Sequence, residues 1–160
     1  MATIYLAGGC FWGVEKFFEQ FDGLETEAGY ANGLTENPSY EDLHATGHAE
    51  AVKIDYDPET IGLEQILEYY FMIIDPFSVN RQGNDFGKQY RTGIWYTSDD
   101  QADAIDNVVS RVEEAAGKPV AVQIGPIRNY YTAEEYHQRY LDKHPQGYCH
   151  IDPALFNLDK

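Results

Sequence analysis

The chain has 160 residues, of which 43% are hydrophobic and 14% aromatic, enough for one well-buried core and too few for two ordinary domains. Its 11 Lys and Arg against 27 Asp and Glu give a formal net charge of −16, which would repel a phosphate backbone or an anionic membrane surface. We therefore expect a single domain over residues 1–160, a monomer without nucleic acid or membrane partners.

The N-terminus and the cysteines indicate a cytoplasmic protein. No apolar run approaches the roughly 20 residues of a membrane-spanning helix, and the first residues lack the basic and apolar regions of a signal peptide. The two cysteines, Cys10 and Cys149, lie near opposite ends of the chain, unlike the dense disulfide framework of small secreted domains. In a reducing compartment, such paired thiols are more often catalytic than structural.

The first pattern places Cys10 at a corner between a strand and a helix. Residues 3–7 are typical of a short strand, which Gly8-Gly9 ends. Apolar residues then follow at helical spacing, at Val14, Phe17, Phe18 and Phe21.

Residues 50–57 alternate in the manner of a half-buried strand. Val52, Ile54 and Tyr56 share the apolar face, and Glu50 is in phase with them. The pattern therefore predicts a carboxyl group on the core side of a sheet.

Two longer helices follow. An apolar stripe runs over residues 63–74 until Asp75-Pro76 ends it, because proline cannot continue a helix. The next helix begins at Ser98, which forms a capping-box pattern with Gln101, and ends before Gly117.

The remaining elements are shorter. Residues 91–97 and 120–124 are typical of strands, and Thr132 with Glu135 fits a capping box that would open a helix to about residue 141. Beyond residue 141 the sequence shows no regular spacing of apolar residues, and we expect residues 142–160 to form a mobile arm that carries Cys149. The fold class is α/β (α+β), with one mixed β-sheet covered by helices and a coil-rich C-terminal segment.

The position of Cys10 suits a nucleophile, since a thiol attacks as thiolate and a helix N-terminus favours that anion. The acidic chain opposes this effect, so we expect Cys10 to be only partly ionised. The same field and the apolar face of its strand should raise the pKa of Glu50 and keep a fraction protonated.

The residues around Cys10 resemble the signature of the peptide methionine sulfoxide reductase A family. The signature is Gly8-Gly9-Cys10-Phe11-Trp12-Gly13, and further matches lie at 29–33, 37–40, 46–50, 81–85, 89–91 and 147–149.

The resemblance implies a reductase that returns methionine S-sulfoxide, free or peptide-bound, to methionine and so repairs oxidative damage to proteins. Cys10 would attack the sulfoxide sulfur and become a sulfenic acid, with Glu50 as proton donor. It also implies that Tyr40 and Tyr90 hold the sulfoxide oxygen and that Asp85 organises the polar site.

The resemblance assigns three further positions. Phe11 and Trp12 would form the aromatic pocket for the S-methyl group, and Cys149 would resolve the sulfenic acid to a disulfide. Better-known members carry a further C-terminal cysteine, which this chain lacks, so thioredoxin is expected to reduce the Cys10–Cys149 bond directly. No cofactor and no metal are implied, thioredoxin or another dithiol serving as reductant.

Three other functions compete with this interpretation. A metal-dependent hydrolase could use His44, His48 and Glu50, although Gly47 argues against one helix carrying both histidines. A thiol hydrolase would need a base such as His137, His144 or His150. A non-enzymatic redox sensor would use the two cysteines only as a switch.

Overall fold

A computed structural model describes residues 1–158, except for the side chain of His44. The strands are β1 Ala2–Gly8, β2 Leu24–Ala31, β3 Ala49–Tyr56, β4 Arg81–Gln82, β5 Asp85–Phe86, β6 Thr92–Tyr96, β7 Gln123–Pro126 and β8 Tyr130–Thr132. The α-helices are α1 Phe11–Phe18, α2 Leu43–Thr46, α3 Leu63–Ile73, α4 Asp99–Ala116 and α5 Tyr140–Lys143, and the short 3₁₀ helices are η1 Tyr40–Asp42, η2 Lys88–Tyr90, η3 Glu135–His137 and η4 Pro153–Asn157.

Six strands form one mixed sheet in the order β7-β6-β1-β3-β2-β8. Only the β6–β7 pair is parallel, and every other neighbouring pair in this sheet is antiparallel. Strands β4 and β5 make a separate two-stranded hairpin. The mixed sheet with its helices confirms the fold class that the sequence predicts.

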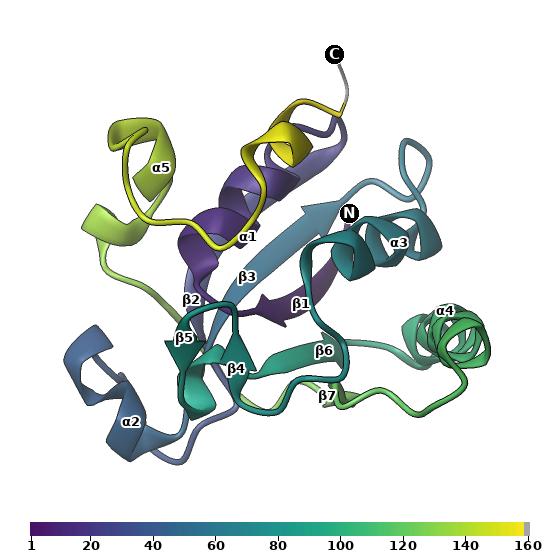
Figure 1. Cartoon of the computed structure of the whole chain (residues 1–160), viewed down its shortest axis with the longest axis horizontal. Coiled ribbons are helices and arrows are strands. Elements are labelled where there is room, and N and C mark those ends of the chain that lie inside the picture. Colours follow the sequence, from purple (N-terminus) through teal and green to yellow (C-terminus); the bar gives the residue numbers. More distant parts are fainter. Residues whose placement is uncertain (159–160) are drawn as a thin grey trace.

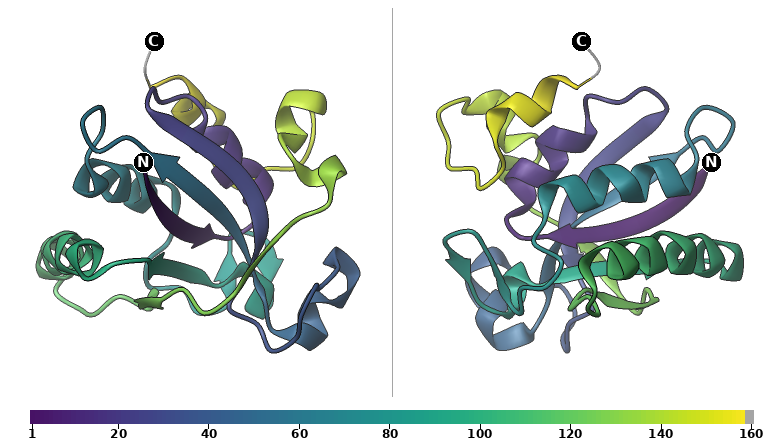
Figure 2. Two further views of the ribbon diagram at one scale, coloured as in Figure 1. Left: turned by 180° about the vertical axis from the view of Figure 1, so that it is seen from behind. Right: turned by 45° about the vertical axis from the view of Figure 1, so that its right-hand side comes forward.

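The long helices α1, α3 and α4 cover the same face of the sheet (Figure 1). Seen from behind, the strands lie in front of α1 (Figure 2, left). The main core fills the space between these layers, and it takes alternate residues from the central strands, such as Ile4 and Leu6 of β1 and Val52 and Ile54 of β3. Each such side chain contributes about 1.5–3 kcal/mol when fully buried.

Helix α4 has the ends that its sequence predicts. The side chain of Ser98 accepts a hydrogen bond from the backbone N–H of Gln101, and Gly117 ends the helix with the left-handed φ of 72° that glycine tolerates. Residues 63–74 and 50–57 likewise form α3 and β3 within one residue of the predicted bounds.

The helix predicted from Thr132 to residue 141 is wrong. Thr132 ends strand β8, where it pairs with Gly29 and its hydroxyl donates to Glu27. Residues 130–132 therefore form interstrand hydrogen bonds with the edge of β2, and these outweigh the local capping box. The short helices η3 and α5 follow in place of the predicted helix. The strand predicted over 120–124 lies three residues later, at Gln123–Pro126.

The C-terminal segment lies along α1 (Figures 1 and 2). Glu15 accepts a hydrogen bond from the backbone N–H of Arg139, Lys16 pairs with Asp142, and the side chain of Gln20 bonds the backbone at both Leu155 and Leu158. Among residues 1–158 there is no helix with the length and apolar character required to cross a membrane.

Candidate active site

Cys10 lies at the corner where β1 meets α1. Gly9 turns the chain with φ +90°, a conformation that favours glycine, and Cys10 occupies the N-cap position with φ −58° and ψ 123°. The side chain of Cys10 is 5% exposed. Burial, then the nearby Glu50 charge, raise the pKa of the Cys10 thiol far above its usual value, while a hydrogen bond from the Trp12 backbone N–H acts in the opposite direction.

Glu50 lies directly against the start of α1. Its Oε1 accepts a hydrogen bond at 3.1 Å from the backbone N–H of Phe11, the residue that follows Cys10. The side chain is 0% exposed, as the alternation in its strand predicts, and its Oε2 has no hydrogen-bond partner among the described residues. Burial raises the pKa of Glu50 to about 8, with the Asp85 charge adding to the rise and the Phe11 bond opposing it. Glu50 therefore keeps its proton at neutral pH.

The polar residues expected at the site come together around Glu50. Burial, followed by the Glu50 charge, raises the pKa of Tyr40 to about 12 and the pKa of Tyr90 further still. Asp85 acts on the same two hydroxyls, and burial also raises its own pKa. Both tyrosines thus remain O–H donors over the whole physiological range, beside a thiol and a neutral carboxyl.

Aromatic rings enclose the first turn of α1. The ring centroid of Phe11 is 5.2 Å from that of His137 and 6.5 Å from that of Tyr40, and Trp12 stacks on Tyr140 at 3.7 Å. The structure thus places Phe11 and Trp12 among aromatic rings directly after Cys10.

His137 is a member of this cluster that sequence reasoning considered only as a hydrolytic base. The indole N–H of Trp12 donates to its Nδ1 at 3.0 Å, and an indole nitrogen can only donate. Nδ1 must therefore be an acceptor, and burial, which lowers the pKa of His137, keeps the ring neutral with its proton on Nε2. A histidine held in this way orients Trp12 and is unsuited to act as the base of a hydrolase.

The segment 148–150 closes over the site. Cys149 is half-buried and its Sγ accepts a hydrogen bond from the backbone N–H of Ile151 at 3.3 Å. Tyr148 and His150 lie on either side of it, near enough to Asp85 to lower its pKa against the effect of burial. A Cβ built on Gly9 would lie 3.2 Å from the His150 ring, so the segment packs closely on the corner that holds Cys10.

Gly13 lets Cys149 approach the helix. A Cβ at this position would lie 2.7 Å from the Cys149 Sγ, closer than real Cβ atoms approach other atoms, and 3.1 Å from Ile151 Cδ1. Gly13 stands three residues after Cys10, on the same side of the helix. Cys10 and Cys149 are both free thiols, and Cys149 is near enough to add to the rise in the pKa of Cys10.

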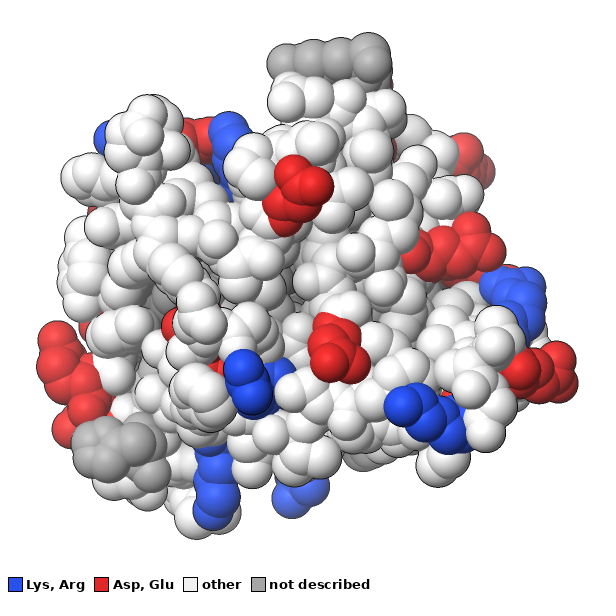
Figure 3. Space-filling view, in the orientation of Figure 1, with Lys and Arg blue, Asp and Glu red and all other residues white. Residues whose placement is uncertain are grey.

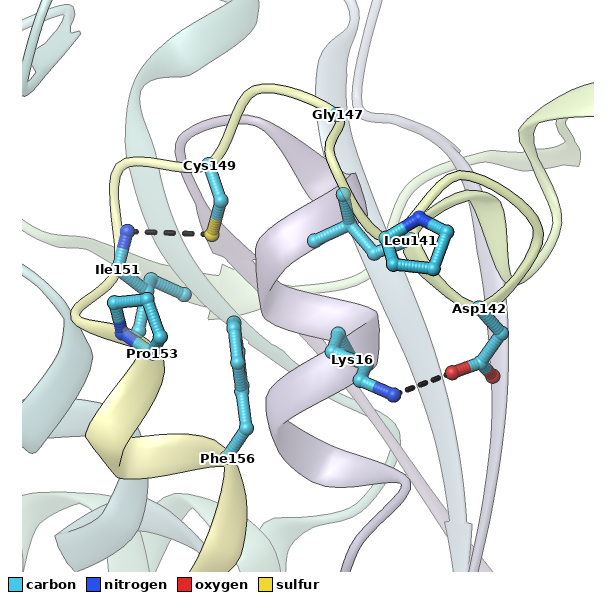
Figure 4. A pocket seen from close by; sticks show the side chains of 9 residues that line it. Lys16, Leu141, Asp142, Gly147, Cys149, Ile151, Pro153 and Phe156 are labelled. Atoms are coloured by element: carbon cyan, nitrogen blue, oxygen red, sulfur yellow. Dashed lines mark hydrogen bonds and ion pairs between the residues drawn. The ribbon is translucent and has the colours of Figure 1, made fainter.

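A pocket of about 330 Å³ opens beside Cys149, between α1 and the C-terminal segment. Figure 4 shows the Cys149 side chain at one end of this pocket and the Lys16–Asp142 pair at the other. The second thiol is therefore reachable from outside, whereas Cys10 is buried.

The metal hypothesis finds no support among the described side chains. Helix α2 ends at Thr46 with Gly47 at φ 76°, so His48 lies outside the helix that contains His44. The ring of His48 bonds the hydroxyl of Thr46 at 2.9 Å, and the side chain of His44 lies outside the described residues. Among the side chains that are described, no group of three His, Cys, Asp or Glu could hold a metal ion.

Two thiols at one helix turn, beside a carboxyl that keeps its proton, define a thiol-dependent oxidoreductase. The family model described as "Peptide methionine sulfoxide reductase" matches residues 2–159. A protein of Lachnoclostridium phytofermentans described as "Peptide methionine sulfoxide reductase MsrA" is 48% identical over 161 residues, covering 99% of this chain and 97% of its own length.

Solved structures that resemble this chain include Mxr1 from Saccharomyces cerevisiae in two forms. Reduced Mxr1 from Saccharomyces cerevisiae superposes with a TM-score of 0.87 at 39% identity, over 92% of this chain and 87% of that one. Mxr1 in complex with Trx2 superposes with a TM-score of 0.62 at 29% identity, over 86% of this chain and 83% of that one. The chain therefore belongs to the peptide methionine sulfoxide reductase family, and its activity is that of a peptide-methionine (S)-S-oxide reductase.

Proposed function

We propose that Cys10 reduces the sulfoxide by direct attack of its Sγ on the sulfoxide sulfur, with Glu50 as the proton donor. The observation that carries this proposal is the hydrogen bond between Glu50 and the N–H next to Cys10, since it holds the acid beside the nucleophile. The Sγ–S bond forms as Glu50 gives its proton to the sulfoxide oxygen. The protonated oxygen is then transferred from the methionine sulfur to Sγ as the S–O and Sγ–S bonds break, so methionine leaves and Cys10 becomes a sulfenic acid. The thiol proton replaces the proton that Glu50 gave up, so Glu50 is neutral again at the end of the step.

The hydroxyls of Tyr40 and Tyr90 would donate hydrogen bonds to the sulfoxide oxygen as negative charge develops on it. Their raised pKa values support this role, because a tyrosinate could only accept. Glu134 supports the position of Tyr40 by accepting a hydrogen bond from its backbone N–H at 3.3 Å.

The S-methyl group would lie against Phe11 and Trp12, where ring faces suit a small, polarizable apolar group. The substrate is methionine S-sulfoxide, free or within proteins, and the physiological role is repair after oxidative damage. We propose that the enzyme works as a monomer, which sedimentation of the reduced protein would test.

His137→Phe should destabilise this pocket. The indole N–H of Trp12 would lose its acceptor, and because this donor is partly buried we expect a cost toward the lower end of the roughly 1–3 kcal/mol typical of a buried unpaired donor. We expect a lower free energy of unfolding in urea and a KM for methionine S-sulfoxide raised several-fold. His137→Asn is the matched control, since Asn Oδ1 can take the place of Nδ1 and should restore both values. Equal behaviour of the two variants would contradict this role of His137.

In the second step, the Cys149 thiol would attack the sulfenic acid of Cys10, forming a disulfide and releasing water. A disulfide requires Cα atoms within about 7 Å of each other. The contact between Cys149 Sγ and Gly13 brings the second thiol to the same helix turn, and a movement of the arm 142–160 would complete the approach.

Gly13→Ala should slow disulfide formation by about tenfold or more, because the new methyl group would displace the Cys149 Sγ from the helix. Release of the first methionine should be unchanged, as Cys10 and Glu50 are untouched. Rapid quenching followed by thiol counting measures both steps. Gly62→Ala is the matched control, since a Cβ there would have no atom of another described element within 4 Å. Equal rates of disulfide formation in the two variants would show that Gly13 has no such role.

Thioredoxin would then reduce the Cys10–Cys149 bond. The relative Mxr1 has been solved in complex with Trx2, and it superposes on this chain less well in that form than when reduced, which supports a rearrangement during the cycle. Because Cys149 faces a pocket and Cys10 is buried, the reductant would attack Cys149.

The sulfenic acid tests this proposal directly. Reduced Cys149→Ser protein is mixed with methionine S-sulfoxide and dimedone, which traps sulfenic acids. The protein is then digested, and its peptides are analysed by mass spectrometry. The adduct is expected on the peptide that contains Cys10 and should depend on the sulfoxide. Methionine formation without an adduct at Cys10 would overturn the proposal.

A further inference from the structure

A second pocket, of about 350 Å³, lies at the end of the sheet where β2 stops and β6 and β7 begin. The side chains of Lys88, Arg91 and Arg128 line it, together with the amides of Asn32, Asn80 and Gln123. In Figure 3, Lys and Arg side chains gather along the lower edge of the molecule, below β4, β5 and β6. The pocket thus collects three cations in a chain whose net charge is −16.

Among the residues that the structure describes, these cations have no carboxylate partner. No Asp or Glu is among the residues that line the pocket, and within residues 1–158 none of Lys88, Arg91 and Arg128 takes part in an ion pair. By contrast, Arg111 on α4 pairs with two glutamates. In a protein with 27 acidic residues, three unpaired cations around one pocket are an arrangement that costs electrostatic free energy unless an anion joins them.

Arg91 is held rigidly in this pocket. Its guanidinium donates hydrogen bonds to Gln123 Oε1 at 3.0 Å and to three backbone carbonyls, those of Gly47 at 2.9 Å, Lys88 at 2.8 Å and Asn32 at 3.1 Å. All four acceptors are neutral, and within the described part of the chain the charge is uncompensated and one of the five guanidinium N–H groups has no acceptor. Burial lowers the pKa of Arg91, and the charge of the nearby Arg128, which lines the same pocket, lowers it further.

We propose that this pocket binds a phosphoryl group carried on a small molecule. Three cations match a dianion such as a phosphate monoester better than a single carboxylate. The pocket is about ten times the roughly 30 Å³ that one water molecule occupies in the liquid, so it holds more than a lone ion. Arg91 also fixes the carbonyls that precede β3 and Tyr90, so a ligand there would stabilise both segments. None of the residues that line this pocket is among those proposed to act in the reaction at Cys10.

Inorganic phosphate is the first probe. We expect saturable binding to the wild-type protein by calorimetry, and a rise in Tm with phosphate that sodium chloride at equal ionic strength does not reproduce. Arg128→Ala should weaken phosphate binding about tenfold or more, because it removes a charged donor. Arg128 has no side-chain hydrogen bond in the described part of the chain, so its removal should leave the fold and the reductase activity intact.

Arg111→Ala is the matched control, since it changes the net charge equally at the α3–α4 surface. Unchanged phosphate affinity in this variant would support a specific site. The proposal is overturned if wild-type protein shows no saturable binding, if both arginine variants lose affinity equally, or if acetate binds as tightly as phosphate.

Discussion

Glu50→Gln is expected to lower kcat/KM for methionine S-sulfoxide by about 10²- to 10⁴-fold, the usual contribution of a positioned general acid. The amide keeps an oxygen for the Phe11 N–H but cannot donate a carboxyl proton. Because the pKa of Glu50 lies at about 8, wild-type activity should fall as the pH rises through that value, when the acid is lost. Steady-state rates from pH 6 to pH 10, measured as methionine released, check both expectations.

The same substitution should stabilise the fold. A carboxyl whose pKa rises from 4.5 unfolded to about 8 folded holds a proton only in the folded state between these values, so stability falls as pH rises through that window. At 1.4 kcal/mol per pKa unit, the burial of Glu50 lowers the free energy of unfolding by roughly 3 kcal/mol at pH 7. Glu50→Gln removes this loss, although the unpaired amide of the new side chain offsets part of the gain.

Urea unfolding of both proteins measures this cost. The stability advantage of the Gln variant should grow from pH 5 to pH 8 and then stay constant. Near-normal turnover by Glu50→Gln, or a stability advantage of this variant that does not depend on pH, would contradict the role of Glu50 as the proton donor.

Cys149→Ser is expected to reduce steady-state turnover with thioredoxin by at least about a hundredfold, because the sulfenic acid loses its intramolecular thiol partner. The first methionine should still be released at the wild-type rate, and a small dithiol at high concentration should restore part of the turnover. The measurement is thioredoxin-coupled oxidation of a nicotinamide reductant.

Cys10→Ser is the companion variant. It should release no methionine with either reductant, which distinguishes the nucleophile from the resolving thiol. Undiminished thioredoxin-dependent turnover by Cys149→Ser would show that Cys149 is not the partner of Cys10.

Local patterns in the sequence predict the parts of this fold that depend on near neighbours. The Ser98 cap and the Gly117 stop define α4, and the alternation of β3 predicts that Glu50 is buried. Strand β2 carries no such alternation, since its first half is partly exposed and its second half is buried on both faces. Its pairing with β8, which overrides the capping box at Thr132, depends on residues about 100 positions away.

The candidate site divides in the same way. The corner at Gly9 and Cys10 can be predicted from the glycines and the helix that follows. The role of His137 cannot, because nothing near it in the sequence shows that the Trp12 indole, 125 residues earlier, donates to its ring. Likewise, no local pattern indicates that Gly13 makes room for Cys149, because the contact forms only when the C-terminal segment lies along α1.

The most direct test of the mechanism is a single turnover. Reduced wild-type protein is mixed with excess methionine S-sulfoxide without a reductant, and the methionine released and the free thiols remaining are counted on one sample. The mechanism predicts about one methionine per chain, the loss of both thiols, and a disulfide between Cys10 and Cys149. Methionine release with both thiols intact, or a disulfide that forms without methionine, would contradict it.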